Sequence, residues 1–253
     1  MHNPLKLTGR RILITGAASG IGRATAILVS RLGGCVAGVD RNREGLEEAM
    51  SALEGEGHIC HACDLRELNS VKHWMTNLAE QTGPLHGLVH AAGLPCTAPL
   101  RVLEPDVYRD MWTVNTEAAL ALVRGFQSRR VYAGDRGSIV LISSVMGIVG
   151  SPTIVGYSMS KAALIGMGRS MALELAPKHI RVNCVAPGFV RTPMYSQVAG
   201  FWDAEQEARI TAQHPLGPGD QEDVANAIAF LLGDASRWIT GSVLTVDGGY
   251  TAQ

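Results

Sequence analysis

The stretch Thr15-Gly-Ala-Ala-Ser-Gly-Ile-Gly22 decides the fold class, because it joins a short apolar run to a segment with helical spacing. The run before it, Arg11–Thr15, is typical of a buried strand, and apolar residues recur with helical spacing over residues 20–32. Glycines at such a turn permit a tight bend and let the backbone approach a diphosphate at the positive end of the following helix. The spacing G-x-x-x-G-x-G departs from the commoner G-x-G-x-x-G. The indication of a nucleotide site therefore rests on the strand–turn–helix context.

Short apolar runs alternate with helical patterns along the whole chain. The expected strands are Arg11–Thr15, Cys35–Asp40, His58–Asp64, Gly87–Ala91, Ser138–Ser143, Arg181–Val185 and Ser242–Val246. The expected helices cover residues 20–32, 43–54, 67–82, 104–132, 153–176 and 221–232. This alternation predicts a single-domain α/β fold of the Rossmann type, a doubly wound parallel sheet of about seven strands with helices on both faces. One domain should span residues 1–253, with a substrate lid at about 193–214 around a short helical segment.

Composition excludes several classes of function. The chain has 253 residues, 46% of them hydrophobic and 18% charged, and 22 basic against 23 acidic side chains give a formal net charge of −1. A balanced charge offers no electrostatic reason to bind nucleic acid or an anionic membrane, and no apolar run has the roughly 18 residues that span a bilayer. The first residues lack the apolar core of a secretory signal, and the five dispersed cysteines are typical of thiols in a reducing compartment. We expect a cytoplasmic protein without a nucleic-acid or membrane partner.

The segment from His58 to Cys63 has the composition of a metal site. Alternation along a strand, however, places His58 and Cys60 on one side and His61 and Cys63 on the other, so that four ligands cannot converge. We therefore expect no metal there.

Asp40 ends the second expected strand, 18 residues beyond Gly22. A carboxylate at this place accepts hydrogen bonds from the ribose 2′-hydroxyl of a dinucleotide and repels a 2′-phosphate. Arg41 follows directly, and it would pair with a 2′-phosphate if its side chain turned inward. The sequence therefore favours NAD(H) as the cofactor and leaves NADP(H) open.

Tyr157 and Lys161 are four residues apart in an expected helix, so their side chains share one face. A free phenol has a pKa of about 10 and is a poor base at neutral pH, but a neighbouring ammonium favours its ionised form. Tyr157 would then exchange a proton with a substrate oxygen as hydride is transferred. Ser144, at the end of the fifth expected strand, is placed to hold that oxygen.

Together these features resemble the short-chain dehydrogenase/reductase family. The resemblance rests on Thr15–Gly22, Asp40, Asp64, Asn115, Ser144, Tyr157, Lys161 and Pro187-Gly188, and it extends to the ending Gly241–Gly249. It implies an NAD(P)(H)-dependent enzyme that interconverts a ketone and a secondary alcohol. One position departs from the family: the usual Asn-Asn-Ala-Gly after the fourth strand reads His90-Ala-Ala-Gly93. This departure puts the side-chain bracing of the strand in doubt, and we expect His90 to be a strand residue with a satisfied ring rather than a proton shuttle.

The resemblance also implies a role for each matching residue. Tyr157 would be the acid/base, Lys161 would lower its pKa and hold the nicotinamide ribose, and Ser144 would orient the substrate oxygen. Asn115 would interrupt its helix and hold a water that links Lys161 to solvent. The other implied cofactor contacts are Gly16, Ser19, Gly20, Ile21, Gly22, Asp40, Arg41, Asp64, Leu65, Ala92, Gly93, Pro187, Gly188, Val190 and Thr192.

The expected substrate is apolar in part, because the residues that flank the catalytic positions are apolar. The pocket candidates are Leu94, Val145, Met146, Ile154, Val155, Phe189 and Met194, with Tyr195, Phe201 and Trp202 on the lid. The chain resembles the 3-oxoacyl-carrier-protein reductase branch, which implies a 3-oxoacyl thioester of carrier protein or coenzyme A and acyl carrier protein as a partner. Lys178 matches a basic position of that branch, whereas Asp135 and Asp40 depart from it. The alternative is an NAD-dependent dehydrogenase of a cyclic alcohol, polyol or sugar-like compound.

The catalytic residues and the small residues of two helices bear on activity and on assembly. A non-catalytic cofactor-binding sensor of the same fold is disfavoured, because Tyr157, Lys161, Ser144 and Asn115 are all present. Small residues in the helices at 104–132 and 153–176 permit close contact between helices. Since members of the family pair through these two helices, the resemblance implies a homo-oligomer, usually a tetramer.

Overall fold

The computed structural model describes residues 3–200 and 203–253, and it has the predicted α/β architecture. Seven parallel strands form one sheet in the order β3-β2-β1-β4-β5-β6-β9, so the strand order reverses between β1 and β4. These strands are β1 (Arg11–Thr15), β2 (Cys35–Asp40), β3 (Ile59–Ala62), β4 (Gly87–His90), β5 (Gly137–Ile142), β6 (Ile180–Pro187) and β9 (Val243–Val246). A short separate pair follows β6, formed by β7 (Val190–Arg191) and β8 (Gly219–Asp220).

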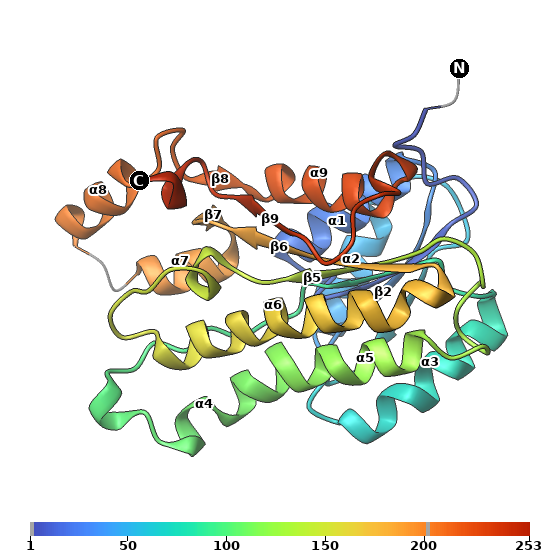
Figure 1. The fold of residues 1–253 in the computed structure, drawn as a ribbon, viewed down its shortest axis with the longest axis horizontal. Coiled ribbons are helices and arrows are strands. Elements are labelled where there is room, and N and C mark those ends of the chain that lie inside the picture. Colours follow the sequence, from blue (N-terminus) through green and yellow to red (C-terminus); the bar gives the residue numbers. More distant parts are fainter. Residues whose placement is uncertain (1–2, 201–202) are drawn as a thin grey trace.

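Helices cover both faces of the sheet (Figure 1). One core includes side chains of α1 (Gly20–Arg31), α2 (Arg43–Ser51) and α9 (Gln221–Leu232), and the other includes side chains of α3 (Leu68–Thr82), α5 (Ala118–Phe126) and α6 (Val155–Leu175). Leu13 and Leu88 belong to the second core, whereas Ile12, Ile14 and Val89 belong to the first, as strand alternation requires. Because both faces are covered, the central strands are mostly apolar, and this is the pattern that predicted a parallel sheet.

The helix expected over residues 104–132 is not uniform. α4 (Pro105–Trp112) passes into a π-helical turn, η2 (Thr113–Glu117), and α5 follows and ends at Phe126. The expected end at residue 132 was therefore wrong, whereas the interruption that the resemblance implied at Asn115 is present as the π-turn. Pro105 starts α4 at a position where its missing N–H costs no hydrogen bond. The π-turn contains Asn115, and such turns often occur at functional sites.

The stretch at 193–214 contains two helices rather than one short helical segment. These are α7 (Pro193–Ala199) and α8 (Ala204–Ala212), and both lie at the end of the molecule where α4 and α6 begin (Figure 1). Short 3-10 turns complete the fold: η1 (Leu100–Val102), η3 (Val145–Gly147), η4 (Ala176–Lys178), η5 (Asp234–Ser236) and η6 (Tyr250–Ala252). Among the described helices, none is both long and apolar enough to cross a membrane.

Candidate active site

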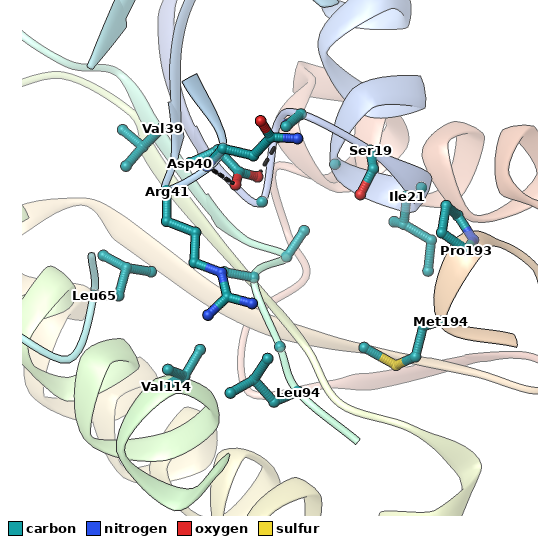
Figure 2. A pocket seen from close by; sticks show the side chains of 18 of the residues that line it. Ser19, Ile21, Val39, Asp40, Arg41, Leu65, Leu94, Val114, Pro193 and Met194 are labelled. Atoms are coloured by element: carbon teal, nitrogen blue, oxygen red, sulfur yellow. Dashed lines mark hydrogen bonds between the residues drawn. The ribbon is translucent and has the colours of Figure 1, made fainter. Parts of the chain in front are cut away.

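A groove of about 440 Å³ opens at the carboxyl ends of β1, β2 and β4, where the strand order reverses (Figure 2). The glycine turn forms part of its wall. Gly16 has a φ of 70°, and a Cβ there would lie only 2.8 Å from the backbone nitrogen of Ala92. A Cβ on Gly22 would collide with the carbonyl oxygen of Gly16. These two glycines therefore let the turn fold on itself and against the end of β4.

The first turn of α1 borders the groove without a side-chain cap. Ser19 is the N-cap residue and its backbone is extended, but its side chain makes no capping hydrogen bond with the described residues. Backbone N–H groups in the first turn of a helix carry the positive end of the helix dipole and bind anions. This part of the groove fits the diphosphate of a dinucleotide.

Asp40 and Arg41 lie next to each other beside the turn. The Asp40 carboxylate is held in place, because its Oδ2 accepts a hydrogen bond from the backbone nitrogen of Ala18 at 3.1 Å and its Oδ1 accepts one from that of Asn42 at 3.0 Å. The Arg41 side chain extends into the groove (Figure 2). The groove therefore contains both a fixed carboxylate, which suits a 2′-hydroxyl, and a cation.

Asp64 lines the groove, but its carboxylate is already paired. Arg66 donates to both carboxylate oxygens of Asp64, and its Nη1 donates to Oδ2 of Asp110 on α4 at 2.7 Å. Hydrogen bonding by the Arg66 side chain lowers the pKa of Asp64. An adenine contact, as the resemblance implied, would have to share this carboxylate with Arg66.

The groove brings together most of the expected cofactor contacts. Its walls include Gly16, Ser19, Gly20, Ile21, Gly22, Asp40, Arg41, Asp64, Leu65, Ala92, Gly93 and Thr192. Five expected cofactor contacts do not line it, namely Tyr157, Lys161, Pro187, Gly188 and Val190. Val190 is a buried core residue, and Gly188 packs so closely that a Cβ would lie 2.9 Å from the Cα of Asp247.

Sequence reasoning missed several residues of the groove wall. These are Ala18, Val39, Asn42, Cys63, Ala91, Pro95, Val114, Pro193 and Gln197. Most of them adjoin an expected residue at the end of a strand, and this adjacency was the available signal. Val114 and Gln197 reach the groove from η2 and α7, and no local pattern marks them.

Tyr157 and Lys161 come together near the start of α6, as their spacing predicts. The Nζ of Lys161 lies 5.6 Å from the centroid of the Tyr157 ring. Ser144, which follows β5, lies close enough to the Tyr157 phenol for its hydroxyl to lower the pKa of that phenol. The Ser144 hydroxyl oxygen also accepts a hydrogen bond from the backbone nitrogen of Met146 at 3.1 Å. A phenol, a hydroxyl and an ammonium thus share one site.

Burial decides the protonation of this site. Desolvation raises the pKa of Tyr157 to about 12, even though the nearby Ser144 hydroxyl favours the ionised phenol. Desolvation also lowers the pKa of Lys161 to about 8, while its Nζ donates to the carbonyl oxygen of Ile142 at 2.9 Å. The expectation that Lys161 lowers the pKa of Tyr157 therefore differs from this structure, in which the loss of water around the phenol outweighs its polar contacts.

Asn115 connects the loop after β4 with α6. Its Oδ1 accepts a hydrogen bond from the backbone nitrogen of Leu94 at 2.8 Å, and its Nδ2 donates to the Leu94 oxygen and to Oγ of Ser160, each at 3.1 Å. Both amide hydrogens are used, so a water held by this side chain, as the resemblance implied, would bind at Oδ1. A Cβ on Gly93 would lie 3.3 Å from Oδ1 of Asn115 and 3.5 Å from Nζ of Lys161. Gly93 thus brings the groove wall close to Asn115 and Lys161.

The expected substrate pocket is only partly assembled around the groove. Leu94 and Met194 line it, whereas Val145 and Met146 are buried in η3, which packs against α6. Ile154 is half-buried outside the groove wall, and Phe189 packs edge-on against His214 at 5.4 Å between ring centroids. Phe201 and Trp202 lie outside the described residues.

The segment from His58 to Cys63 has ordinary structural contacts. His61 stacks on Trp74 at 5.0 Å between ring centroids, and Nδ1 of His58 accepts a hydrogen bond from the backbone of Val36. Within residues 3–200 and 203–253, no three His, Cys, Asp or Glu side chains are grouped so as to hold a metal ion.

Comparison with known proteins establishes the family. A family model described as enoyl-(acyl carrier protein) reductase matches residues 16–251, a range that includes the glycine turn, Tyr157 and Lys161. The chain belongs to the short-chain dehydrogenase/reductase family. This short-chain dehydrogenase/reductase is an NAD(P)-dependent oxidoreductase, as its relatives are.

Relatives of this short-chain dehydrogenase/reductase differ in substrate. A 3-oxoacyl-[acyl-carrier-protein] reductase of Thermotoga maritima is 36% identical over 97% of this chain and 99% of its own length. A cis-4-hydroxycyclohexanecarboxylate dehydrogenase of Sinomonas cyclohexanicum is 38% identical over 96% of this chain and 97% of its own length. A crystal structure from Beutenbergia cavernae, described as an NAD(P)-dependent gluconate 5-dehydrogenase with NADP bound at low occupancy, has a TM-score of 0.90 and 34% identity and covers 99% of this chain and 100% of that one.

Proposed function

We propose that Tyr157 is the acid/base with which this oxidoreductase interconverts a ketone and a secondary alcohol. The observation that carries the proposal is the cluster of Tyr157, Ser144 and Lys161. Its Lys161 ammonium lies next to Gly93 of the groove wall. Bound NADH or NAD⁺ would supply or accept the hydride. Ser144 would orient the substrate oxygen, to which Tyr157 gives its proton in reduction and from which it takes a proton in oxidation.

The protonation of the site suits the reduction of a ketone in particular. With a pKa of about 12, the phenol of Tyr157 carries its proton at neutral pH and is ready to donate it to a substrate oxygen. With a pKa of about 8, Lys161 is largely charged at the same pH and stabilises the phenolate that remains after the transfer. Asn115 would hold the loop after β4 and the helix α6 in place relative to each other through its hydrogen bonds to Leu94 and Ser160.

For the cofactor, the proposal is a preference for NAD(H) over NADP(H). The fixed carboxylate of Asp40 supports it, because a carboxylate at this strand end pairs with a 2′-hydroxyl and repels a 2′-phosphate. Arg41, which also lines the groove, carries a positive charge that would attract a 2′-phosphate. NADP(H) is therefore proposed as a second cofactor. The proposed dinucleotide contacts are the expected residues that line the groove, together with Tyr157 and Lys161, of which Lys161 lies next to Gly93. Thr192 of the groove wall would contact the nicotinamide, whereas Pro187, Gly188 and Val190 lie outside that wall.

For the substrate, two classes are compatible with the apolar side chains of Leu94 and Met194. One is a 3-oxoacyl thioester of acyl carrier protein or coenzyme A, as the name of the Thermotoga relative suggests. The other is a cyclic alcohol, polyol or sugar-like compound, as the name of the Sinomonas relative suggests. Asp40 favours the second class, because its carboxylate repels the 2′-phosphate of NADPH, the cofactor that is usual in the carrier-protein branch.

A substrate panel followed by absorbance of the reduced nicotinamide tests the proposal. It pairs acetoacetyl-coenzyme A, cyclic ketones and alcohols, and polyols with each of NADH, NAD⁺, NADPH and NADP⁺. The expected result is turnover of a cyclic or polyol substrate with NAD(H) at a kcat/KM about tenfold or more above that with NADP(H), the contribution of one good hydrogen bond together with one charge repulsion. Turnover of the thioester alone, with NADPH, would favour the carrier-protein branch instead.

The remaining proposals concern lid, assembly and location. Residues 193–214 would close over the bound ligands, because Pro193, Met194 and Gln197 of α7 border the groove.

The protein would form a homotetramer through α4, α5 and α6, on which Leu120, Met159 and Leu173 are 43%, 41% and 78% exposed. A near-neutral net charge and dispersed free cysteines support a cytoplasmic location.

A further inference from the structure

His90 is a buried titratable group that the proposed reaction does not use. It ends β4, it is 1% exposed, and its ring lies between the end of β1 and the π-turn η2. Its Nδ1 is 3.0 Å from Oγ1 of Thr15, and its Nε2 is 3.1 Å from the carbonyl oxygen of Val114. Both ring nitrogens are therefore engaged.

The direction of these hydrogen bonds follows from the neighbours. The backbone nitrogen of Ala92 donates to Oγ1 of Thr15 at 3.2 Å, so the Thr15 hydroxyl has its own hydrogen left to donate to Nδ1 of His90. The Val114 oxygen only accepts, so Nε2 carries the ring hydrogen. The result is one chain of hydrogen bonds that runs from Ala92 through Thr15 and His90 to Val114, and it requires the neutral ring.

Both ends of this chain touch the active site. Ala92 lies in the groove wall, where its backbone nitrogen would be 2.8 Å from a Cβ on Gly16. Val114 lines the same groove and precedes Asn115 in η2. A shift of the His90 ring would therefore displace both the backbone that contacts the glycine turn and Asn115, which is hydrogen-bonded to Leu94 and Ser160.

We propose that His90 is a positioning residue of this active site, whose neutral ring couples the groove wall at Ala92 to the π-turn that carries Asn115. In this chain, one side chain thereby supplies the bracing that the missing pair of asparagines left in doubt. The proposal rests on the proposed function only insofar as the groove binds a nicotinamide dinucleotide.

A histidine at this position makes the coupling sensitive to acid, because its ring can be protonated. The amide of an asparagine could not be. Burial, with a smaller contribution from the charge of Lys161, lowers the pKa of His90 to about 4, against an ordinary value of 6.5. Among the described residues, Lys161 on α6 is the charged group that acts on it. Protonation would place a hydrogen on Nδ1, facing the Thr15 hydroxyl, and would break the chain. Stability from the neutral ring is thus complete above pH 6.5 and is lost as the pH falls toward 4.

Two variants and a matched control test the role of His90. His90→Ala removes donor and acceptor, whereas His90→Asn retains one of each. His86, just before the other end of β4, offers the control, because its Nδ1 also accepts a backbone N–H, from Arg11 at 3.1 Å, but it lies outside the groove wall. We expect His90→Ala to weaken NADH binding, measured by calorimetry, by about tenfold, the effect of leaving a buried polar group unpaired. We expect His90→Asn to restore binding to within about threefold of the wild type, and His86→Ala to leave it unchanged.

Thermal unfolding of the cofactor-free protein gives a second readout that needs no ligand. Between pH 7 and pH 4.5, the Tm of the wild type should fall more steeply than that of His90→Asn, because the amide does not titrate. If His90→Ala does not fold, the affinity and the pH slope of His90→Asn still decide. Equal pH slopes for wild type and His90→Asn, or equal NADH affinities for His90→Ala and His86→Ala, would overturn the proposal and leave the role of Tyr157 untouched.

Discussion

The phenol of Tyr157 is the group on which the proposed proton transfer depends. Replacing Tyr157 by Phe keeps the ring and removes only the hydroxyl, so we expect kcat to fall by about 10²- to 10⁴-fold, the usual contribution of a positioned acid/base. The affinity for NADH should change little, because the ring remains. Steady-state kinetics on any substrate found with the panel measures the loss.

Tyr132 provides a control for the loss of a buried hydroxyl. Its oxygen accepts a hydrogen bond from the backbone nitrogen of Gly137 at 3.0 Å, outside the groove wall. Tyr132→Phe should therefore lower the Tm and leave kcat unchanged, since an unpaired buried N–H costs stability and not proton transfer. A Tyr157→Phe enzyme that keeps its kcat within about threefold would contradict the mechanism, because the contribution of an acid/base is much larger.

At the scale of elements, α7 is the helix that the groove shares with the expected lid. Pro193, Met194 and Gln197 line the groove, so a ligand that fills it would contact α7 directly. We expect saturating NADH and substrate to slow amide hydrogen exchange in α7 and α8, measured by mass spectrometry of peptides. Hydrogen exchange in α3, whose side chains pack in the core shared with α5 and α6, should not change. Identical exchange in α7 with and without ligand would argue against a lid.

At the scale of the whole molecule, the exposed apolar side chains on α5 and α6 bear on assembly. Leu173 on α6 is 78% exposed, and a charge there would lie inside the proposed contact between subunits. Leu173→Glu should therefore shift the wild-type tetramer toward smaller species in sedimentation velocity. Leu216, which is 88% exposed in the loop after α8, serves as the control, and Leu216→Glu should leave the distribution unchanged. A monomeric wild type at about 10 µM, a concentration at which a tetramer of ordinary affinity persists, would refute the assembly.

The sequence by itself determined the sheet, the glycine turn and the pairing of Tyr157 with Lys161. These features depend on distances of a few residues: alternation in strands, the 3.6-residue turn of a helix, and the backbone freedom of glycine. For the same reason, the positions of Asp40 and Ser144 at strand ends followed from the predicted strands.

Only the tertiary structure decided the properties that depend on distant segments. Arg66 reaches Asp110, 44 positions away, and occupies the carboxylate of Asp64 on the way. The pKa of Tyr157 rises because of the surroundings that exclude water from it, which no local spacing encodes. The ring of His90 bridges Thr15 and Val114, on elements far apart in the chain. Desolvation and contacts between distant residues arise when the layers pack, so they were beyond any pattern read along one strand or one helix.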